Sequence, residues 1–150
     1  HYLYTRSEAH EISGESFSVE RLIRNREAGR ITVIDFTADW CPNCKLVESI
    51  TLGDETVSAA LRADDVDLMI ADITVKNPPA EYLMSQFNSQ SIPLLAIIPP
   101  GEAFGRPIVL RDIYSADDVL RALHMARESK EERNNTEYQL IIPDHLQKKI

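Results

Sequence analysis

One stretch constrains the fold of this chain more than any other: the fifteen residues Ile31-Thr-Val-Ile-Asp-Phe-Thr-Ala-Asp-Trp-Cys-Pro-Asn-Cys-Lys45. Its first six residues, Ile31–Phe36, are mostly apolar and β-branched, which predicts a buried strand. An amphipathic helix is predicted to start at the first cysteine and to carry Leu46, Val47 and Ile50. A CxxC motif therefore lies where a strand turns into a helix.

The two cysteines of this motif are the only cysteines in the chain. Any disulfide within one molecule must therefore join Cys41 to Cys44. A bridge across two intervening residues closes a very small loop, so it stabilises the fold less than a long-range bridge does. We therefore expect this pair to open and close as part of a redox reaction.

The segment Asp35–Lys45 resembles the active-site segment of the thioredoxin superfamily. Within it, Asp39-Trp40-Cys41 and Cys44-Lys45, together with Glu48, are most similar to the C-terminal thioredoxin-like domain of DsbD-type thiol:disulfide interchange proteins. A looser likeness extends from residue 31 to 125. The resemblance implies a thiol-disulfide oxidoreductase, most often a reductase, that needs no cofactor beyond its own redox-active disulfide. The implied partners are protein disulfides and a membrane domain that donates electrons.

Cys41 is the candidate nucleophile, because a thiolate is the attacking species and a helix N-terminus stabilises an anion there. Cys44, one turn further into the helix, would resolve the mixed disulfide. In the family the acid at the position of Asp35 takes a proton from the second cysteine. Glu48 is a second candidate for this role, and the alternative is an ordinary solvated carboxylate on the helix surface.

The resemblance also implies a substrate-binding surface. Pro93 matches the cis-proline that faces the CxxC in the family, and Ile92 before it would offer backbone hydrogen bonds to an extended partner. Trp40 and Pro42 flank the nucleophile, although Trp40 could instead be a packing residue. Thioredoxins often carry Trp where this chain has Thr37, a departure that bears on reduction potential and partner choice.

The remaining pattern predicts an α/β thioredoxin fold, with a central mixed sheet of four to five strands and helices on both faces. Strand, helix and strand in succession imply a parallel pair with a right-handed crossover. The Pro99–Glu102 stretch predicts a type II turn. Beyond the central stretch, the predicted elements are helices beginning after Ser18, at Glu55, after Asn77 and after Ser115, and strands at Val66–Ala71, Ile92–Ile98 and Pro107–Leu110.

We expect one thioredoxin-like domain over residues 17–128. Residues 1–16 form a lead-in segment, with a short strand near His10–Ser13. Residues 129–150 form a polar linker and a tail, in which Tyr138–Ile142 is apolar enough to dock on the domain or on a neighbouring chain.

The charge of the chain excludes some partners. With 24 acidic and 16 basic residues the formal net charge is −8, which argues against nucleic acid and against anionic membrane surfaces. No stretch has the roughly 18 consecutive apolar residues of a membrane helix. The missing initiator Met suggests an excised or processed piece, and the resemblance implies a membrane-anchored parent. We expect a periplasmic or other extracytoplasmic location, with a cytoplasmic one left open.

Two other functions remain open at this point. One is a freestanding thioredoxin-like reductase or oxidase. The other is a metal-binding protein that uses Cys41 and Cys44, for which the four histidines show no ligand spacing. No metal ligand is therefore predicted.

Overall fold

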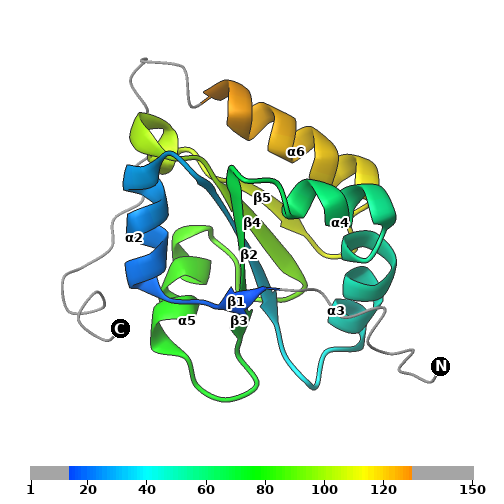
Figure 1. Cartoon of the computed structure of the whole chain (residues 1–150). Coiled ribbons are helices and arrows are strands. Elements are labelled where there is room, and N and C mark those ends of the chain that lie inside the picture. Colours follow the sequence, from blue (N-terminus) through cyan, green and yellow to red (C-terminus); the bar gives the residue numbers. More distant parts are fainter. Residues whose placement is uncertain (1–13, 130–150) are drawn as a thin grey trace.

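The central sheet has five strands in the order β1-β3-β2-β4-β5 (Figure 1). In the computed structural model, residues 14–129 are described. β1, β2 and β3 run parallel, whereas β4 runs antiparallel to β2 and β5 antiparallel to β4. The predicted mixed sheet and the parallel crossover are therefore confirmed. The strands are β1 (Glu15–Ser16), β2 (Ile31–Thr37), β3 (Val66–Asp72), β4 (Leu94–Ile98) and β5 (Ile108–Arg111).

Helices cover both faces of this sheet, as predicted (Figure 1). One face carries α2 (Val19–Ala28) and α5 (Pro78–Gln86), and the other carries α3 (Pro42–Val47), the π-helix η1 (Glu48–Leu52), α4 (Glu55–Leu61) and α6 (Ala116–Ser129). The alternation of β2 produces this arrangement, because successive side chains point to opposite faces. Ile34 packs in the core under α2 and α5, and Val33 packs in the core under α4 and α6.

Local signals set the ends of the helices. The Ser18 hydroxyl accepts a hydrogen bond from the Arg21 N–H at 2.9 Å, and Gly29 ends α2 with a φ of 79°. Before α6 a reciprocal capping box forms, in which Ser115 Oγ accepts from the Asp118 N–H and Asp118 Oδ2 accepts from the Ser115 N–H. Both predicted helix starts are confirmed.

The connection between β4 and β5 holds more than the predicted turn. Pro100 is extended and Gly101 has a positive φ of 63°, which is the backbone that a type II turn needs at its two central residues. A short 3-10 helix, η2 (Gly101–Gly105), which was not predicted, begins at the same glycine. Phe104 of this helix is buried, and the Arg26 guanidinium stacks on its ring at 4.5 Å from the centroid. Contacts with α2, which no local turn signal encodes, therefore shape this connection.

Two polar side chains also differ from expectation. Asn77 precedes α5 as predicted, but its side chain donates to the Asp72 carbonyl and does not cap the helix. On α2, Asn25 lies on the buried face of the helix together with Val19 and Leu22. Its amide donates to Thr32 Oγ1 at 3.0 Å and to Asp67 Oδ2 at 2.8 Å, which satisfies its polar atoms within the core.

The expected strand at His10–Ser13 and the expected tail from residue 130 onward lie outside the described residues. Within residues 14–129, no helix is long and apolar enough to cross a membrane.

Candidate active site

The two cysteines lie at the point where β2 leads into α3. Cys41 is the residue before the first turn of α3, and a disulfide joins it to Cys44. The Cys44 N–H donates a hydrogen bond to Cys41 Sγ at 3.1 Å, so this sulfur takes the place of a helix cap. Cys41 is 6% exposed and Cys44 is fully buried. Of the two cysteines, Cys41 is thus the one that a partner can reach.

A second segment approaches the disulfide from β4. The Ile92–Pro93 peptide bond is cis, as the resemblance implied. Ile92 is half-buried and packs against the cluster formed by Cys41 and Cys44. The Pro93 carbonyl accepts a hydrogen bond from the Asp112 N–H at 3.1 Å, which ties the end of β5 to this segment.

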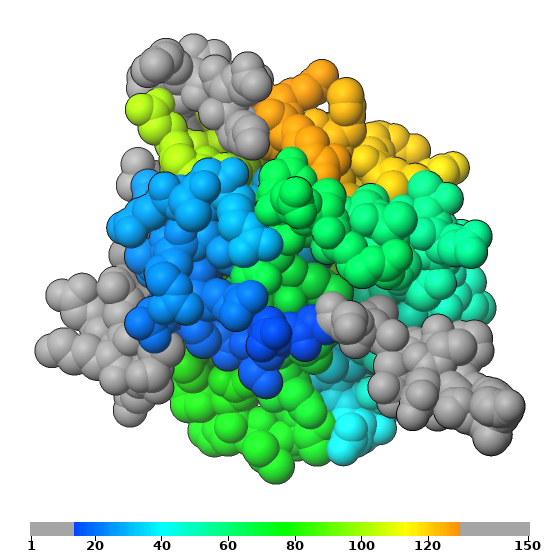
Figure 2. Space-filling model, viewed as in Figure 1, coloured from blue at the N-terminus to red at the C-terminus, as the bar shows by residue number. Residues whose placement is uncertain are grey.

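Hydrogen bonds join the loops that follow β2 and β3. The Asp39 N–H donates to Thr74 Oγ1 at 2.8 Å, and the Thr74 hydroxyl donates to Asp72 Oδ1 at 2.6 Å. In Figure 2 these loops lie next to each other at the lower edge, in cyan and green. Trp40 is 61% exposed beside them, which does not fit the alternative of a packing residue, and Pro42 is exposed as well.

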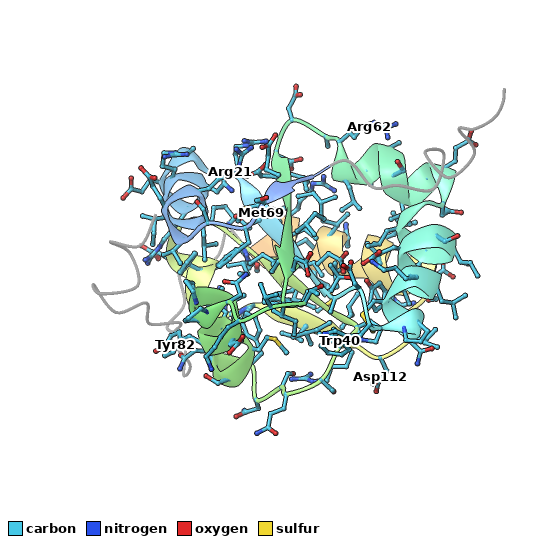
Figure 3. The ribbon with its side chains drawn as sticks, turned by 90° about the horizontal axis from the view of Figure 1, so that it is seen from below. Arg21, Trp40, Arg62, Met69, Tyr82 and Asp112 are labelled. Carbon is cyan, nitrogen blue, oxygen red and sulfur yellow. A yellow bond between two sulfur atoms is a disulfide. The ribbon has the colours of Figure 1, made fainter. Side chains whose placement is uncertain are left out.

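Other apolar side chains are exposed at this end of the molecule. Val75, in the loop after β3, is 75% exposed, and Ile113, after β5, is 58% exposed. Figure 3 shows Trp40 on the same side of the molecule as Asp112, the neighbour of Ile113. Because the Asp39–Thr74 bond and the Pro93–Asp112 bond connect these loops, the exposed apolar residues surround the cysteines and the cis-proline.

Two carboxyl groups meet on the inner side of the disulfide. Asp35 of β2 is fully buried, and the Glu48 side chain is 15% exposed, so the alternative of a solvated Glu48 does not fit. The Glu48 N–H donates to the Cys44 carbonyl, which places this acid one turn after the buried cysteine. Lys45 Nζ lies 3.7 Å from Glu48 Oε1. The structure thus brings the two predicted acids together at the foot of the CxxC motif.

The pKa of Asp35 is raised well above its usual value. Burial is the largest cause, followed by the nearby Glu48, and the charge of Lys45 lowers it. Neither Asp35 oxygen has a hydrogen-bond partner among the described residues. Burial and the neighbouring acid therefore both favour the protonated form of Asp35.

Sequence reasoning missed one residue of this site, Tyr114, which lies between β5 and α6. It is 3% exposed, and its carbonyl accepts a hydrogen bond from Thr51 Oγ1 of η1 at 2.8 Å. Burial, then the charges of Asp35 and Glu48, raise the pKa of its phenol. A tyrosine just before a capping box carries no pattern that would place it in a site, so only the tertiary contacts identify it.

The π-helix was also not predicted. The helix was expected to continue through Ile50, but α3 passes into η1 at Glu48. Leu46 and Ile50 are exposed, at 41% and 65%, whereas Val47 is buried. π-Turns insert an extra residue per turn and occur often at functional sites. Here the wider turn starts at the acid that meets Asp35.

Metal-binding side chains do not cluster in the described part of the chain. No three or more His, Cys, Asp and Glu residues there form a group that could hold a metal ion.

A sequence model of the thioredoxin-like family matches residues 15–100. The thiol:disulfide interchange protein DsbD 1 of Pseudomonas aeruginosa is 38% identical over 80 residues, which are 53% of this chain and 13% of that protein. The DsbD of Campylobacter jejuni is 30% identical over 91 residues, 61% of this chain and 15% of that protein. This chain thus spans a small part of the length of both relatives.

Solved structures agree in fold. The oxidised C-terminal domain of DsbD from Neisseria meningitidis has a TM-score of 0.58 and 20% identity, and the match covers 77% of this chain and 100% of that one. A thioredoxin from Thermus thermophilus has a TM-score of 0.58 and 19% identity, with 80% and 92% covered. These likenesses confirm the predicted thioredoxin fold.

Proposed function

Because this chain belongs to the thioredoxin-like family, it is a thiol-disulfide oxidoreductase, and we propose that it works as the reductase domain of a DsbD-type protein. The observation that carries the proposal is the asymmetry of the cysteine pair. Cys41 caps the helix at the surface, and Cys44 is fully buried, one turn before Glu48.

In the proposed reaction the reduced protein attacks a disulfide of its substrate. The Cys41 thiolate forms a mixed disulfide with one substrate sulfur and expels the other as a thiolate. The N–H groups at the start of α3, including that of Cys44, stabilise the anion before the attack. Cys44 then attacks Cys41 Sγ and releases the second substrate thiol. Two electrons pass to the substrate, and the Cys41–Cys44 disulfide is left behind.

The second step requires that Cys44 lose its proton inside the protein. A buried thiol attacks poorly because burial disfavours its anion. We assign the acceptor role to Asp35 and Glu48, the buried and half-buried acids next to the CxxC motif. The Glu48 side chain is 15% exposed, so a proton on this acid has direct access to solvent.

The partner is proposed to bind over the apolar rim of Trp40, Val75 and Ile113. All three side chains are more than half exposed, and burying them on contact would stabilise the complex. Ile92 lies against the cysteine cluster next to the cis bond, a place from which its backbone could pair with an extended substrate strand.

The finer assignments follow from the DsbD relatives. The electron donor is proposed to be a membrane domain of the same or another chain, and the acceptors are exported proteins with disulfides. The proposed location is the periplasm or another extracytoplasmic compartment, as part of a membrane-anchored parent. The domain is proposed to span residues 17–128, between a lead-in segment and a polar tail.

Trapping the mixed disulfide tests the mechanism. Cys44→Ser should accumulate a covalent complex with a model disulfide substrate through Cys41, because the resolving thiol is missing. Cys41→Ser should trap nothing and should abolish turnover. Half-buried Ser49 of the following π-helix η1 offers a control, since Ser49→Ala should behave as the parent protein. Equal trapping by both cysteine variants would contradict the assigned roles.

The direction of electron flow is tested by the reduction potential. Equilibration against a glutathione or dithiothreitol series, followed by Trp40 fluorescence, should give a potential near or below about −270 mV, the value of thioredoxin. A potential near about −120 mV would mark an oxidant and would contradict the reductase proposal.

A further inference from the structure

The loops that follow β2 and β3 are joined beyond the end of the sheet. Strand pairing ends at Thr37 and Asp72, but the Ile73 N–H still donates to the Thr37 carbonyl at 2.8 Å. One step further, the Asp39 N–H donates to Thr74 Oγ1 at 2.8 Å. The two loops therefore continue side by side past the sheet, toward the cysteines.

A carboxylate sets the direction of the Thr74 hydroxyl. Asp72 Oδ1 accepts from the Thr74 hydroxyl at 2.6 Å and from the Thr74 N–H at 2.9 Å. The proton of this hydroxyl therefore points to Asp72, and the oxygen lone pairs stay available for the Asp39 N–H. The pKa of Asp72 is lowered, chiefly by these two hydrogen bonds from Thr74. Asp72, Thr74 and Asp39 thus form a directed chain of hydrogen bonds across the two loops.

The joined loops carry side chains that surround the disulfide. Ile73, the neighbour of Thr74, packs against the cysteine cluster. Trp40 directly follows Asp39, and Val75 directly follows Thr74. These two members of the apolar rim are 61% and 75% exposed, so little packing holds either side chain in place. The hydrogen bond between the loops is therefore what fixes Trp40 relative to Val75.

The bond between Asp39 and Thr74 contributes more to local order than to global stability. It lies at the surface, where water can replace either partner, so its net contribution to folding is small. A loop that is free to move must, however, be ordered when a partner binds, and this ordering costs free energy. A hydrogen bond that orders the loops beforehand removes that cost.

We propose that Thr74 is a positioning residue that holds the Trp40 and Val75 loops in one arrangement, so that the apolar rim is formed before a partner binds. Asp72 acts through Thr74, because it orients the hydroxyl. The inference rests on the proposed function, since the apolar rim is the surface to which the partner is proposed to bind. No covalent bond to Thr74 forms or breaks.

Amide hydrogen exchange, followed by NMR in the oxidised protein without substrate, measures this bond directly. Thr74→Val has nearly the same shape but no hydroxyl, so the Asp39 amide should exchange about fivefold faster, as expected when one hydrogen bond is lost. Thr74→Ser keeps the hydroxyl and should exchange at the parent rate. Asp72→Ala should also accelerate the exchange, because the hydroxyl is no longer oriented. Thr56→Val, at an exposed threonine of α4, is the matched control and should leave the exchange unchanged.

Two substrates separate binding at the apolar rim from chemistry at the cysteines. One is a synthetic peptide whose disulfide is flanked by leucines, and the other is hydroxyethyl disulfide, which is too small to cover the rim. In Thr74→Val the KM for the peptide should rise about fivefold with kcat unchanged, because the loops must then be ordered on binding. The rate constant for hydroxyethyl disulfide should stay at the parent value.

Unchanged exchange of the Asp39 amide in Thr74→Val would overturn the proposal. Faster exchange with an unchanged KM for the peptide would also overturn it, because the bond would then not shape the binding surface. Equal losses with both substrates would contradict a positioning role. If the parent protein reduces neither substrate, the proposed function fails and this inference fails with it. If the parent reduces both and the KM of Thr74→Val does not move, only this inference fails.

Discussion

Replacing Asp35 with Asn should make the oxidised protein more stable at neutral pH. The pKa of Asp35 is raised above its usual value of 3.8, first by burial and then by Glu48. The folded state therefore keeps a proton that the unfolded state loses. For an acid with a raised pKa, stability is fully present below 3.8 and is lost as the pH rises toward the folded-state pKa.

The size of the effect follows from one proton. Over that window the folded state binds one proton more than the unfolded state, so the free energy of unfolding falls by about 1.4 kcal/mol per pH unit. Asn at position 35 has nearly the same shape and no charge, so the variant lacks this decline. With a urea m-value of about 1 to 3 kcal/mol/M, the unfolding midpoints should separate by about 0.5 to 1.4 M per pH unit.

The assay is urea unfolding of the oxidised protein between pH 5 and pH 7. This range lies above the window in which acids with lowered pKa values, such as Asp67 and Asp72, contribute a pH dependence. Asp64→Asn, at an exposed aspartate before β3, is the matched control and should run parallel to the parent. In Glu48→Gln the decline should end at a lower pH. Parallel curves for the parent and Asp35→Asn would refute the account of a buried, protonated Asp35.

Three further predictions concern the scaffold and can be checked by chemical unfolding at pH 7. Leu22→Ala should cost about 2 to 5 kcal/mol, because Leu22 is fully buried on the inner face of α2, and a loss below 1 kcal/mol would show that the site collapses around the cavity. Gly29→Ala should cost about 1 to 2 kcal/mol, because φ is 79° at this helix end and a residue with a Cβ is strained there. No atom lies near the added Cβ, so the cost comes from the backbone conformation alone. Arg21→Met should cost about 2 to 3 kcal/mol. Burial opposes ionisation of Asp67, but hydrogen bonds from Arg21 and Asn25 outweigh it and lower its pKa. This contribution is present above pH 3.8 and fades as the pH falls through the folded-state value, so the cost should vanish in acid.

Much of the fold could be read from local pattern. The apolar run of β2, the cap at Ser18, the left-handed Gly29 and the capping box at Ser115 each act within a few residues, and each was confirmed. The 3-10 helix η2 was not predicted, because its Phe104 contacts α2, which is distant in the sequence. Expectations fail where a distant element supplies the deciding contact.

The sequence by itself determined the chemistry of this protein. Two cysteines in a CxxC motif between an apolar strand and a helix leave one possible disulfide, and their spacing is a local property. Only the tertiary structure decided which ionisable groups are buried behind that disulfide. The pKa values of Asp35 and Tyr114 are raised by burial and by neighbouring acids, and this environment exists only after the strands and helices have packed.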